Sequence, residues 1–252
     1  MEELADLIAS HGHVRPVVLA ADLSKRGAAE SLAVRAVEAL SHIDVLINNA
    51  APEGVGSYAA AGDDEDSREL FETNYWSPFA LARGLLPSML ARGSGALVSV
   101  SSLGAITPIP GTGHYASSKA ALAIATEALR AELRGSGVRV LLVYPGFVDT
   151  PMLREFKARP ALTARMRRAL SLMPVGTPEG VARAIVRALR RDRSTVVYPP
   201  AYAITPLMPA VSPWFTSLLF GSSAISTSTQ TNRRRCCTST LLRRASTSAA
   251  RP

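Results

Sequence analysis

The stretch Ala96-Leu97-Val98-Ser99-Val100-Ser101-Ser102 is an apolar run that ends in small polar residues. Such a run is typical of a buried strand that leaves its last residues at a sheet edge. Thirteen residues after Ser102 comes Tyr115, in His114-Tyr115-Ala116-Ser117-Ser118-Lys119, at the start of a long helical stretch. Tyr115 and Lys119 are four residues apart and share one helix face, where the cation favours ionisation of a phenol that alone titrates at about 10. The pair suits proton transfer, although the same spacing also occurs on solvated helix faces.

Two further apolar runs end in the same manner. Residues 44–50 end in Asn48-Asn49-Ala50, and residues 138–144 lead into Pro145-Gly146-Phe147-Val148-Asp149-Thr150. Open parallel sheets bind their ligands at the carboxyl ends of the strands. Helical patterns fall between the runs, so the sequence predicts an α/β fold. The expected helices cover residues 27–40, 65–91, 113–134 and 178–191, and a last strand covers residues 194–198.

Together these motifs resemble those of the short-chain dehydrogenase/reductase family, over roughly residues 14–200. The matching motifs are Asn48-Asn49-Ala50, Ser102, Tyr115 with Lys119, and Pro145-Gly146, in the family's order and at its spacings; Ala51 stands where the family usually has Gly. The resemblance implies an NAD- or NADP-dependent oxidoreductase that interconverts a secondary alcohol and a ketone. It assigns the catalytic roles as follows: Tyr115 is the acid/base, Ser102 orients the substrate oxygen, Lys119 lowers the tyrosine pKa and holds the nicotinamide ribose, and Asn74 anchors a water that relays protons to Lys119.

The resemblance also implies a set of cofactor contacts. These are Asp22, Leu23, Asn49, Ala50, Tyr115, Lys119, Pro145, Gly146, Val148 and Thr150. Asp22 matches the acidic residue near the adenine, Asn49 and Ala50 would follow the ribose, and Val148 and Thr150 would contact the carboxamide and a phosphate. Local structure offers an alternative for three of them, since Asp22 and Thr150 are suited to cap the helices that follow them and Asn49 to close a turn.

The chain departs from the family in its first residues. A dinucleotide site needs a glycine-rich turn between strand and helix, and no such turn precedes residues 14–21. The opening Met1-Glu2-Glu3-Leu4-Ala5-Asp6-Leu7-Ile8 resembles the family's second helix. We therefore expect a Rossmann-like, doubly wound parallel sheet that is N-terminally truncated, lacks strands 1 and 2 and keeps about five strands. Residues 14–21 then pair with residues 44–49 or stay unpaired, and a wrong start site or a broken gene would produce the same pattern.

Composition divides the chain into three parts. Residues 1–200 form the expected domain, residues 201–221 an apolar, proline-rich flap or surface-docking segment, and residues 222–252 a basic tail expected to be disordered. The net charge of +8 lies largely in the tail, which holds six of the 28 basic residues and no acid, so the rest carries 22 basic against 20 acidic residues. This distribution argues against a nucleic-acid interface, although Arg233-Arg234-Arg235 would suit phosphates or anionic lipid as well as solvent. The tail could also stem from an altered reading frame.

The remaining features concern location and partners. Cys236 and Cys237 are adjacent and make no zinc pattern, so we expect no metal site and a reduced, cytoplasmic setting. Residues 194–232 carry no charge, but five prolines disfavour a spanning helix and leave docking on a membrane surface as the alternative. Helices formed by residues 65–91 and 113–134 imply, by resemblance, a homodimer interface. By resemblance, the region before the last helix, Met152 to Thr177, shapes the substrate pocket. Its apolar residues suggest a lipophilic substrate, or ordinary amphipathic helices; they are Leu153, Phe156, Leu162, Met166 and Met173.

Two functions from different classes follow from these observations. The first is the nicotinamide-dependent oxidoreductase, favoured by the complete catalytic group. The second is a non-catalytic member of the family that dimerises or binds a partner, or a truncated gene product, favoured by the missing glycine turn. Binding of NADH or NADPH distinguishes them.

Overall fold

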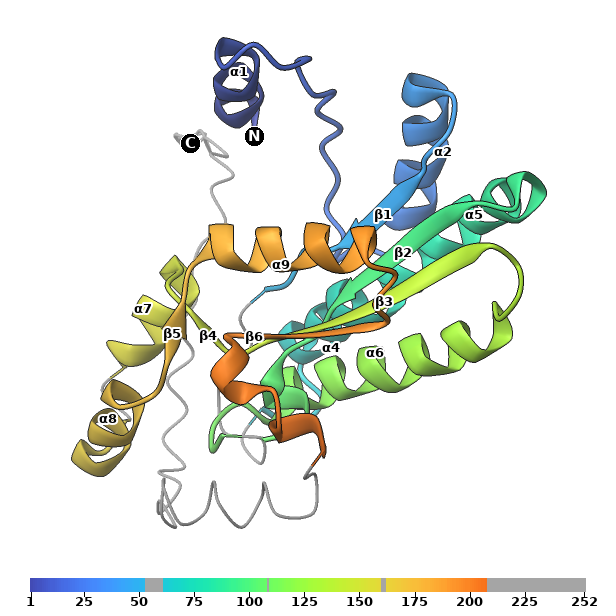
Figure 1. The fold of residues 1–252 in the computed structure, drawn as a ribbon. Helices are drawn as coiled ribbons and strands as arrows, with labels where there is room; N and C mark the ends of the chain where they lie inside the picture. The colour runs from blue at the N-terminus through green and yellow to red at the C-terminus, as the bar shows by residue number, and fades with distance from the viewer. Residues whose placement is uncertain (53–60, 108, 160–161, 208–252) are drawn as a thin grey trace, which may run out of the picture.

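The computed structural model describes residues 1–52, 61–107, 109–159 and 162–207 (Figure 1). Its centre is a four-stranded parallel sheet in the order β1-β2-β3-β6. The strands are β1 (Val45–Asn48), β2 (Gly95–Val100), β3 (Val138–Pro145) and β6 (Thr195–Tyr198). β2 and β3 lie in the middle, with Val98 opposite Leu141, and their apolar residues are buried on both faces. The parallel α/β architecture predicted from the sequence is therefore confirmed.

Helices cover both faces of this sheet (Figure 1). On one face, α2 (Ala28–Leu40), α5 (Ser77–Arg92) and α6 (Gly113–Glu132) pack against Leu97 and Val140. On the other face, α9 (Pro178–Arg190) packs Ile185 and Ala188 against the alternate strand residues. The alternation of strand side chains between the two faces thus produces two separate apolar clusters, one on each side of the sheet.

Short elements complete the described chain. α1 (Glu2–Ser10) stands apart from the sheet in Figure 1 and is joined to Arg15 by ion pairs to Glu2 and Asp6. A small second sheet pairs two short strands that follow β3 and precede α9. The elements not yet named are α4 (Glu65–Phe71), the π-helical turn η1 (Glu72–Trp76), η2 (Leu103–Ala105), β4 (Phe147–Val148), α7 (Pro151–Lys157), α8 (Ala164–Ser171), β5 (Val175–Gly176), η3 (Pro200–Tyr202) and η4 (Thr205–Leu207).

The sheet has four strands in the described ranges, and the expectation of about five was wrong. Residues 14–21 form no strand, and the Ala20 carbonyl accepts a hydrogen bond of 2.8 Å from Arg35 of α2 instead. β1 is consequently the outer strand, and its Val45 and Ile47 are 40% and 47% exposed. The second alternative, in which this segment stays unpaired, is the one that the structure adopts.

Three other expectations concern a long helix, a membrane-spanning segment and a flap. The helix expected over residues 65–91 is interrupted by η1, so it consists of α4, one π-helical turn and α5. No helix in the described ranges is both long enough and apolar enough to cross a bilayer. The flap expected over residues 201–221 contains η3 and η4 up to Leu207; its remainder and the tail over residues 222–252, with Arg233-Arg234-Arg235, Cys236 and Cys237, lie outside the described residues.

Candidate active site

The first turns of α6 bring Tyr115 and Lys119 to the carboxyl end of β2. Tyr115 is partly buried, whereas Lys119 is only 2% exposed. The Lys119 ammonium donates a hydrogen bond of 2.9 Å to the Val100 carbonyl, at the last residue of β2. Burial disfavours the charged ammonium and lowers the pKa of Lys119 to about 8. A cation with a pKa near neutrality thus lies one helical turn from the tyrosine.

A second contact fixes the helix against the same strand end. The Ser101 hydroxyl donates a hydrogen bond of 2.8 Å to the Lys119 carbonyl, and both residues are buried. Val100 and Ser101 therefore hold the side chain and the main chain of one lysine. The placement of Lys119 depends on the last residue of β2 and on the residue that follows it, which suits a group whose position matters for chemistry.

Ser102 lies next to Tyr115. Its hydroxyl oxygen accepts a hydrogen bond of 3.0 Å from the Gly104 backbone and so begins η2. A methyl group added at Gly104 would lie 3.3 Å from the Ser102 hydroxyl oxygen and 3.8 Å from a ring carbon of Tyr115. The two side chains therefore flank the same glycine. A hydroxyl has one donor and two acceptor positions, so this hydrogen bond uses an acceptor position of Ser102 and not its proton.

Asn74 reaches the site from the π-helical turn η1. It is completely buried, and its side-chain amide nitrogen donates a hydrogen bond of 3.0 Å to the Ser118 hydroxyl. Ser118 in turn donates a hydrogen bond of 2.8 Å to the Tyr115 carbonyl. Single π-helical turns occur often at functional sites. The four predicted catalytic residues are thus brought together by the ends of one strand and two helices, with Ser118 and Ser101 as links that the sequence analysis did not single out.

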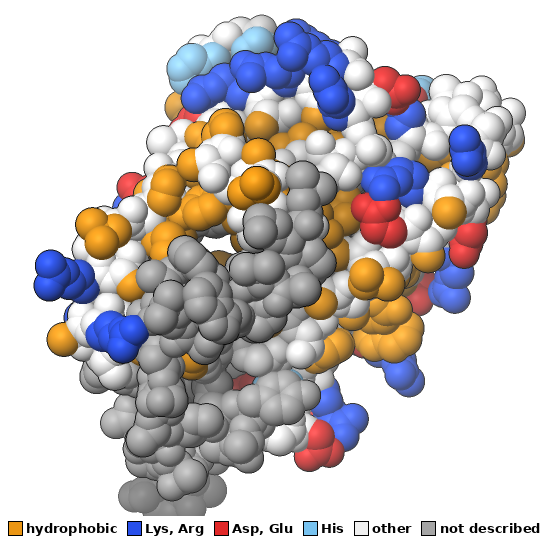
Figure 2. All heavy atoms as spheres, turned by 60° about the horizontal axis from the view of Figure 1, so that its bottom comes forward, with side chains coloured by type: hydrophobic (Ala, Val, Ile, Leu, Met, Phe, Trp, Pro, Cys, Tyr) orange, Lys and Arg blue, Asp and Glu red, His pale blue; other side chains and the backbone are white. Residues whose placement is uncertain are grey.

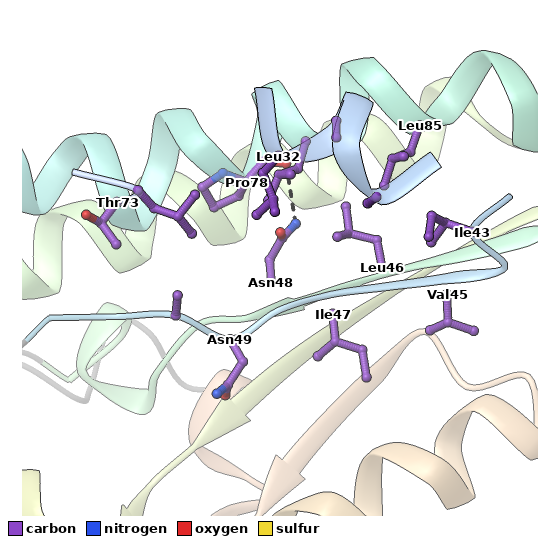
Figure 3. A pocket seen from close by; sticks show the side chains of 15 residues that line it. Leu32, Ile43, Val45, Leu46, Ile47, Asn48, Asn49, Thr73, Pro78 and Leu85 are labelled. Atoms are coloured by element: carbon purple, nitrogen blue, oxygen red, sulfur yellow. Dashed lines mark hydrogen bonds between the residues drawn. The ribbon is translucent and has the colours of Figure 1, made fainter. Parts of the chain in front are cut away.

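The predicted cofactor residues fall into two groups. Leu23, Asn49 and Ala50 line a groove of about 310 Å³ between β1, α2 and α5. In Figure 3, Leu32, Leu46 and Leu85 meet on the helix side of β1, while Asn49 lies with Ile47 and Val45 on the opposite side. The groove is largely apolar, with Asn48, Asn49 and Thr73 as its polar side chains.

The second group follows β3. The Gly146 backbone donates to the Tyr198 carbonyl at 2.7 Å, and a methyl group at Gly146 would lie 2.7 Å from ring carbons of Tyr202. The Tyr202 hydroxyl donates to the Pro174 carbonyl at 2.9 Å, and burial raises its pKa to about 12. Tyr202 therefore covers the Pro145-Gly146 turn, a contact that no sequence motif indicated because the ring arrives from the far end of the described chain.

The local alternatives for Asp22 and Thr150 had different outcomes. Thr150 does cap a helix, since its hydroxyl oxygen accepts from the Leu153 backbone at the start of α7. Asp22 caps no helix, because α2 begins after Gly27. Its carboxylate instead accepts hydrogen bonds from the backbone and hydroxyl of Ser24, and these bonds lower its pKa. The role of Asp22 beside an adenine stays a prediction.

The apolar residues that suggested a lipophilic substrate mostly contact one another. Leu153, Phe156, Leu162 and Met166 are 3–8% exposed and form one cluster between α7 and α8. The alternative of ordinary amphipathic helices is therefore the better description of these four. Ile109 and Phe147 pack against the cluster and are only partly buried, and Met173, the fifth residue of the predicted set, is partly buried and outside the cluster.

Comparison with known proteins agrees with this arrangement. A family profile described as short chain dehydrogenase matches residues 1–161. The ketoacyl reductase HetN of Nostoc sp. is 33% identical over 201 residues, which are 78% of this chain and 67% of the relative. The 1-deoxy-11-beta-hydroxypentalenate dehydrogenase of Streptomyces exfoliatus is 40% identical over 156 residues, covering 61% of this chain and 56% of the relative. A short chain dehydrogenase/reductase from Burkholderia phymatum in complex with NAD is 25% identical, with a TM-score of 0.69 over 83% of this chain and 80% of that one.

The chain belongs to the short-chain dehydrogenase/reductase family, as its motifs predicted. Members of this family are oxidoreductases, and its Rossmann-like fold is the one described above. Asn74, Ser102, Tyr115 and Lys119 occupy the carboxyl edge of the parallel sheet, where folds of this type bind their ligands.

Proposed function

We propose that this chain is an NAD- or NADP-dependent oxidoreductase that interconverts a secondary alcohol and a ketone on a lipophilic substrate. One observation carries the proposal: the Ser102 hydroxyl and the Tyr115 ring flank Gly104, one helical turn from the buried ammonium of Lys119. A serine hydroxyl after β2 and a tyrosine ring on either side of one glycine suit the recognition of one carbonyl oxygen. The buried cation beside them suits a proton donor that must change its charge during the reaction.

In the direction of ketone reduction, Tyr115 gives its phenolic proton to the substrate oxygen. Ser102 donates a hydrogen bond to the same oxygen, because its acceptor side already receives the Gly104 backbone proton. Both contacts strengthen as negative charge develops on that oxygen, so they lower the barrier rather than only binding the substrate. Lys119 balances the charge left on Tyr115, and a pKa of about 8 lets it return a proton near neutral pH.

The cofactor fits the residues of this site in part. One of the three Lys119 N–H groups is used by Val100, so two are left for ribose hydroxyl groups, with the Pro145-Gly146 turn on the adjoining strand for the nicotinamide ring. When bound, NADH or NADPH supplies the hydride. In the described ranges, no glycine-rich turn opens a helix that would hold the diphosphate, and the groove at Leu23, Asn49 and Ala50 is mainly apolar. The proposal that this chain binds NAD or NADP is therefore supported by Lys119 and the Pro145-Gly146 turn, at the nicotinamide end of the site, and by the similarity to the Burkholderia phymatum structure in complex with NAD.

The substrate proposal rests on the surroundings of the two hydroxyl groups. Leu103 follows Ser102 directly and is near Gly146, Phe147 lies one residue beyond that turn, and Tyr202 covers it. These apolar and aromatic side chains favour a substrate that presents carbon rather than charge around its carbonyl group. One of the relatives above is described as a ketoacyl reductase and another as a dehydrogenase of a pentalenate, and both names fit a carbon-rich substrate.

We also propose that the chain forms a homo-oligomer through α5 and α6. Large apolar side chains are exposed there: Trp76 is 57%, Leu90 42% and Ile124 73% exposed. Leu90 and Ile124 belong to the two helices and Trp76 to η1, the turn between α4 and α5; both helices lie on one face of the sheet (Figure 1). Large apolar side chains exposed on neighbouring helices are a common feature of association sites.

Titration of NADH and NADPH fluorescence with the purified chain tests the cofactor proposal. Saturable binding of either is expected. Absence of binding up to about millimolar concentrations overturns the oxidoreductase proposal and favours the second function, a non-catalytic dimerising or binding subunit.

Substitution of the acid/base tests the chemistry. Tyr115→Phe is expected to lower kcat by about 100-fold or more while the cofactor Kd stays nearly unchanged, because only the transferable proton is removed. Tyr75→Phe is the matched control, since Tyr75 contacts Trp76 and Phe79 through its ring and is not placed at the reacting atoms. Ketone reduction at the wild-type rate in Tyr115→Phe would remove Tyr115 from this role.

A further inference from the structure

We infer that Ser118 is a positioning residue that sets the orientation of the Asn74 side-chain amide, an inference that rests on the proposed function for its consequence in catalysis. Ser118 belongs to neither the acid/base pair nor the predicted cofactor set. It is completely buried between Tyr115 and Lys119 in the sequence of α6, and its hydroxyl accepts a hydrogen bond from the side chain of Asn74 in η1.

The hydrogen-bond inventory of a hydroxyl carries the first step. Ser118 has one proton, which it donates to the Tyr115 carbonyl at 2.8 Å. Its oxygen can therefore only accept from Asn74, at 3.0 Å. An acceptor requires the nitrogen of the Asn74 amide, not its oxygen, to face Ser118. The choice between the two orientations of the amide is thus made by the bond between Ser118 and the Tyr115 carbonyl.

The second step concerns the opposite end of the amide. With its nitrogen at Ser118, Asn74 directs Oδ1 elsewhere, and within the described part of the chain this buried oxygen has no hydrogen-bond partner. A buried amide oxygen without a donor is costly, and it is uncommon in folded proteins. Where such an atom occurs beside a group of catalytic residues, it is suited to accept a proton-bearing group during the reaction. Ser118 keeps this acceptor in place, whereas a reversed amide would present a donor there.

This predicts that loss of the Ser118 hydroxyl affects proton movement rather than ligand binding. In Ser118→Ala, the Asn74 amide loses the contact that fixes its orientation, while the Tyr115 and Lys119 side chains keep their own backbone positions on α6. We expect kcat for ketone reduction to fall about tenfold, the KM of the cofactor to stay within about twofold, and the solvent deuterium isotope effect on kcat to rise, because the proton-transfer step becomes slower.

A matched control lies two turns further along the same helix. Thr126 is also buried, and its hydroxyl donates a hydrogen bond of 2.7 Å to the Leu122 carbonyl of its own helix. Thr126→Val removes a buried hydroxyl that has the same kind of backbone bond but no contact with Asn74. Ser118→Cys adds an intermediate variant, since a thiol is a weaker donor and acceptor. The expected order of kcat is wild type and Thr126→Val, then Ser118→Cys, then Ser118→Ala.

A readout independent of activity tests the contact itself. The sequence holds four asparagines, Asn48, Asn49, Asn74 and Asn232, so 15N-asparagine labelling gives four side-chain amide signals, and Asn74→Ala assigns one of them. In the wild type, the Asn74 signal is expected to exchange slowly with solvent. Ser118→Ala should shift this signal and speed its exchange by about tenfold, whereas Thr126→Val should do neither.

The two readouts separate this inference from the proposed function. If the Asn74 signal is the same in Ser118→Ala as in the wild type, the inference is overturned whether or not the chain is active. If the signal changes but kcat and the isotope effect do not, the positioning role is overturned. If the wild type shows no reductase activity, the proposed function fails, and a changed Asn74 signal still supports the orienting contact. If Ser118→Ala does not fold, Ser118→Cys carries the same comparison.

Discussion

Replacement of Lys119 by Met should change how the stability of this protein depends on pH. The Lys119 side chain is 2% exposed, and burial lowers its pKa from 10.5 to about 8. Between these two values the unfolded chain binds a proton that the folded chain does not, so the free energy of unfolding rises with pH in this window. At neutral pH both states carry the charge, and the folded state bears the cost of burying it.

The size of the effect follows from the shift. One pKa unit corresponds to about 1.4 kcal/mol, so a shift from 10.5 to about 8 corresponds to about 3 kcal/mol over the whole window. Most of it, about 2 to 3 kcal/mol, falls between about pH 7 and pH 10. Lys119→Met keeps a side chain of similar length and has no charge to titrate. The wild type should therefore gain about 2 to 3 kcal/mol relative to Lys119→Met across this range.

Urea unfolding at several pH values, followed by circular dichroism, measures this difference. Titration of the groups that do not interact with Lys119 is common to both proteins and cancels in the comparison. Lys157→Met is the control, because Lys157 lies partly exposed on α7. A stability difference between the wild type and Lys119→Met that stays constant from pH 7 to pH 10 would refute the reasoning. The reasoning would also fail if Lys157→Met changed the pH dependence of stability as much as Lys119→Met does.

Two further predictions concern packing and assembly. Gly146→Ala should lower the free energy of unfolding by about 1–3 kcal/mol, since the new methyl group would lie 2.7 Å from the Tyr202 ring. Denaturant unfolding should show a smaller loss when Tyr202→Ala is also present, and an equal loss with and without Tyr202→Ala contradicts the contact. Ile124→Asp should convert the proposed oligomer to a monomer, because Ile124 is 73% exposed on α6, whereas Val34→Asp on α2 should leave the oligomer intact. Size-exclusion chromatography with light scattering measures the mass, and an unchanged mass for Ile124→Asp removes Ile124 from the proposed interface.

Much of the fold could be predicted because local pattern and packing agree over its central elements. The apolar run before Ser102 became β2, and the run before Pro145 became β3, because strands buried on both faces leave a continuous apolar pattern. α2, α6 and α9 begin and end within about two residues of their expected bounds. The candidate catalytic residues could also be predicted, since Ser102, Tyr115 and Lys119 lie at fixed spacings that a family resemblance identifies; their roles stay a prediction.

The failures have a different physical cause. Residues 14–21 have the composition of a strand, but a strand also needs a neighbour for its backbone groups, and the sequence does not state which neighbour is within reach. The apolar residues of α7 and α8 look the same whether they contact a substrate or each other. The π-helical turn at Asn74 lies inside a continuous helical pattern, so periodicity alone cannot reveal it.

The sequence by itself determined the α/β class and the family, and it predicted the residues proposed to move a proton, because each depends on composition and on spacing along the chain. Only the tertiary structure decided that the sheet has four strands in the described ranges, that Tyr202 covers the Pro145-Gly146 turn and that Ser118 joins Tyr115 to Asn74. These features are contacts between residues distant in sequence. They depend on which surfaces and hydrogen-bonding groups lie within reach after folding, and no local pattern records that.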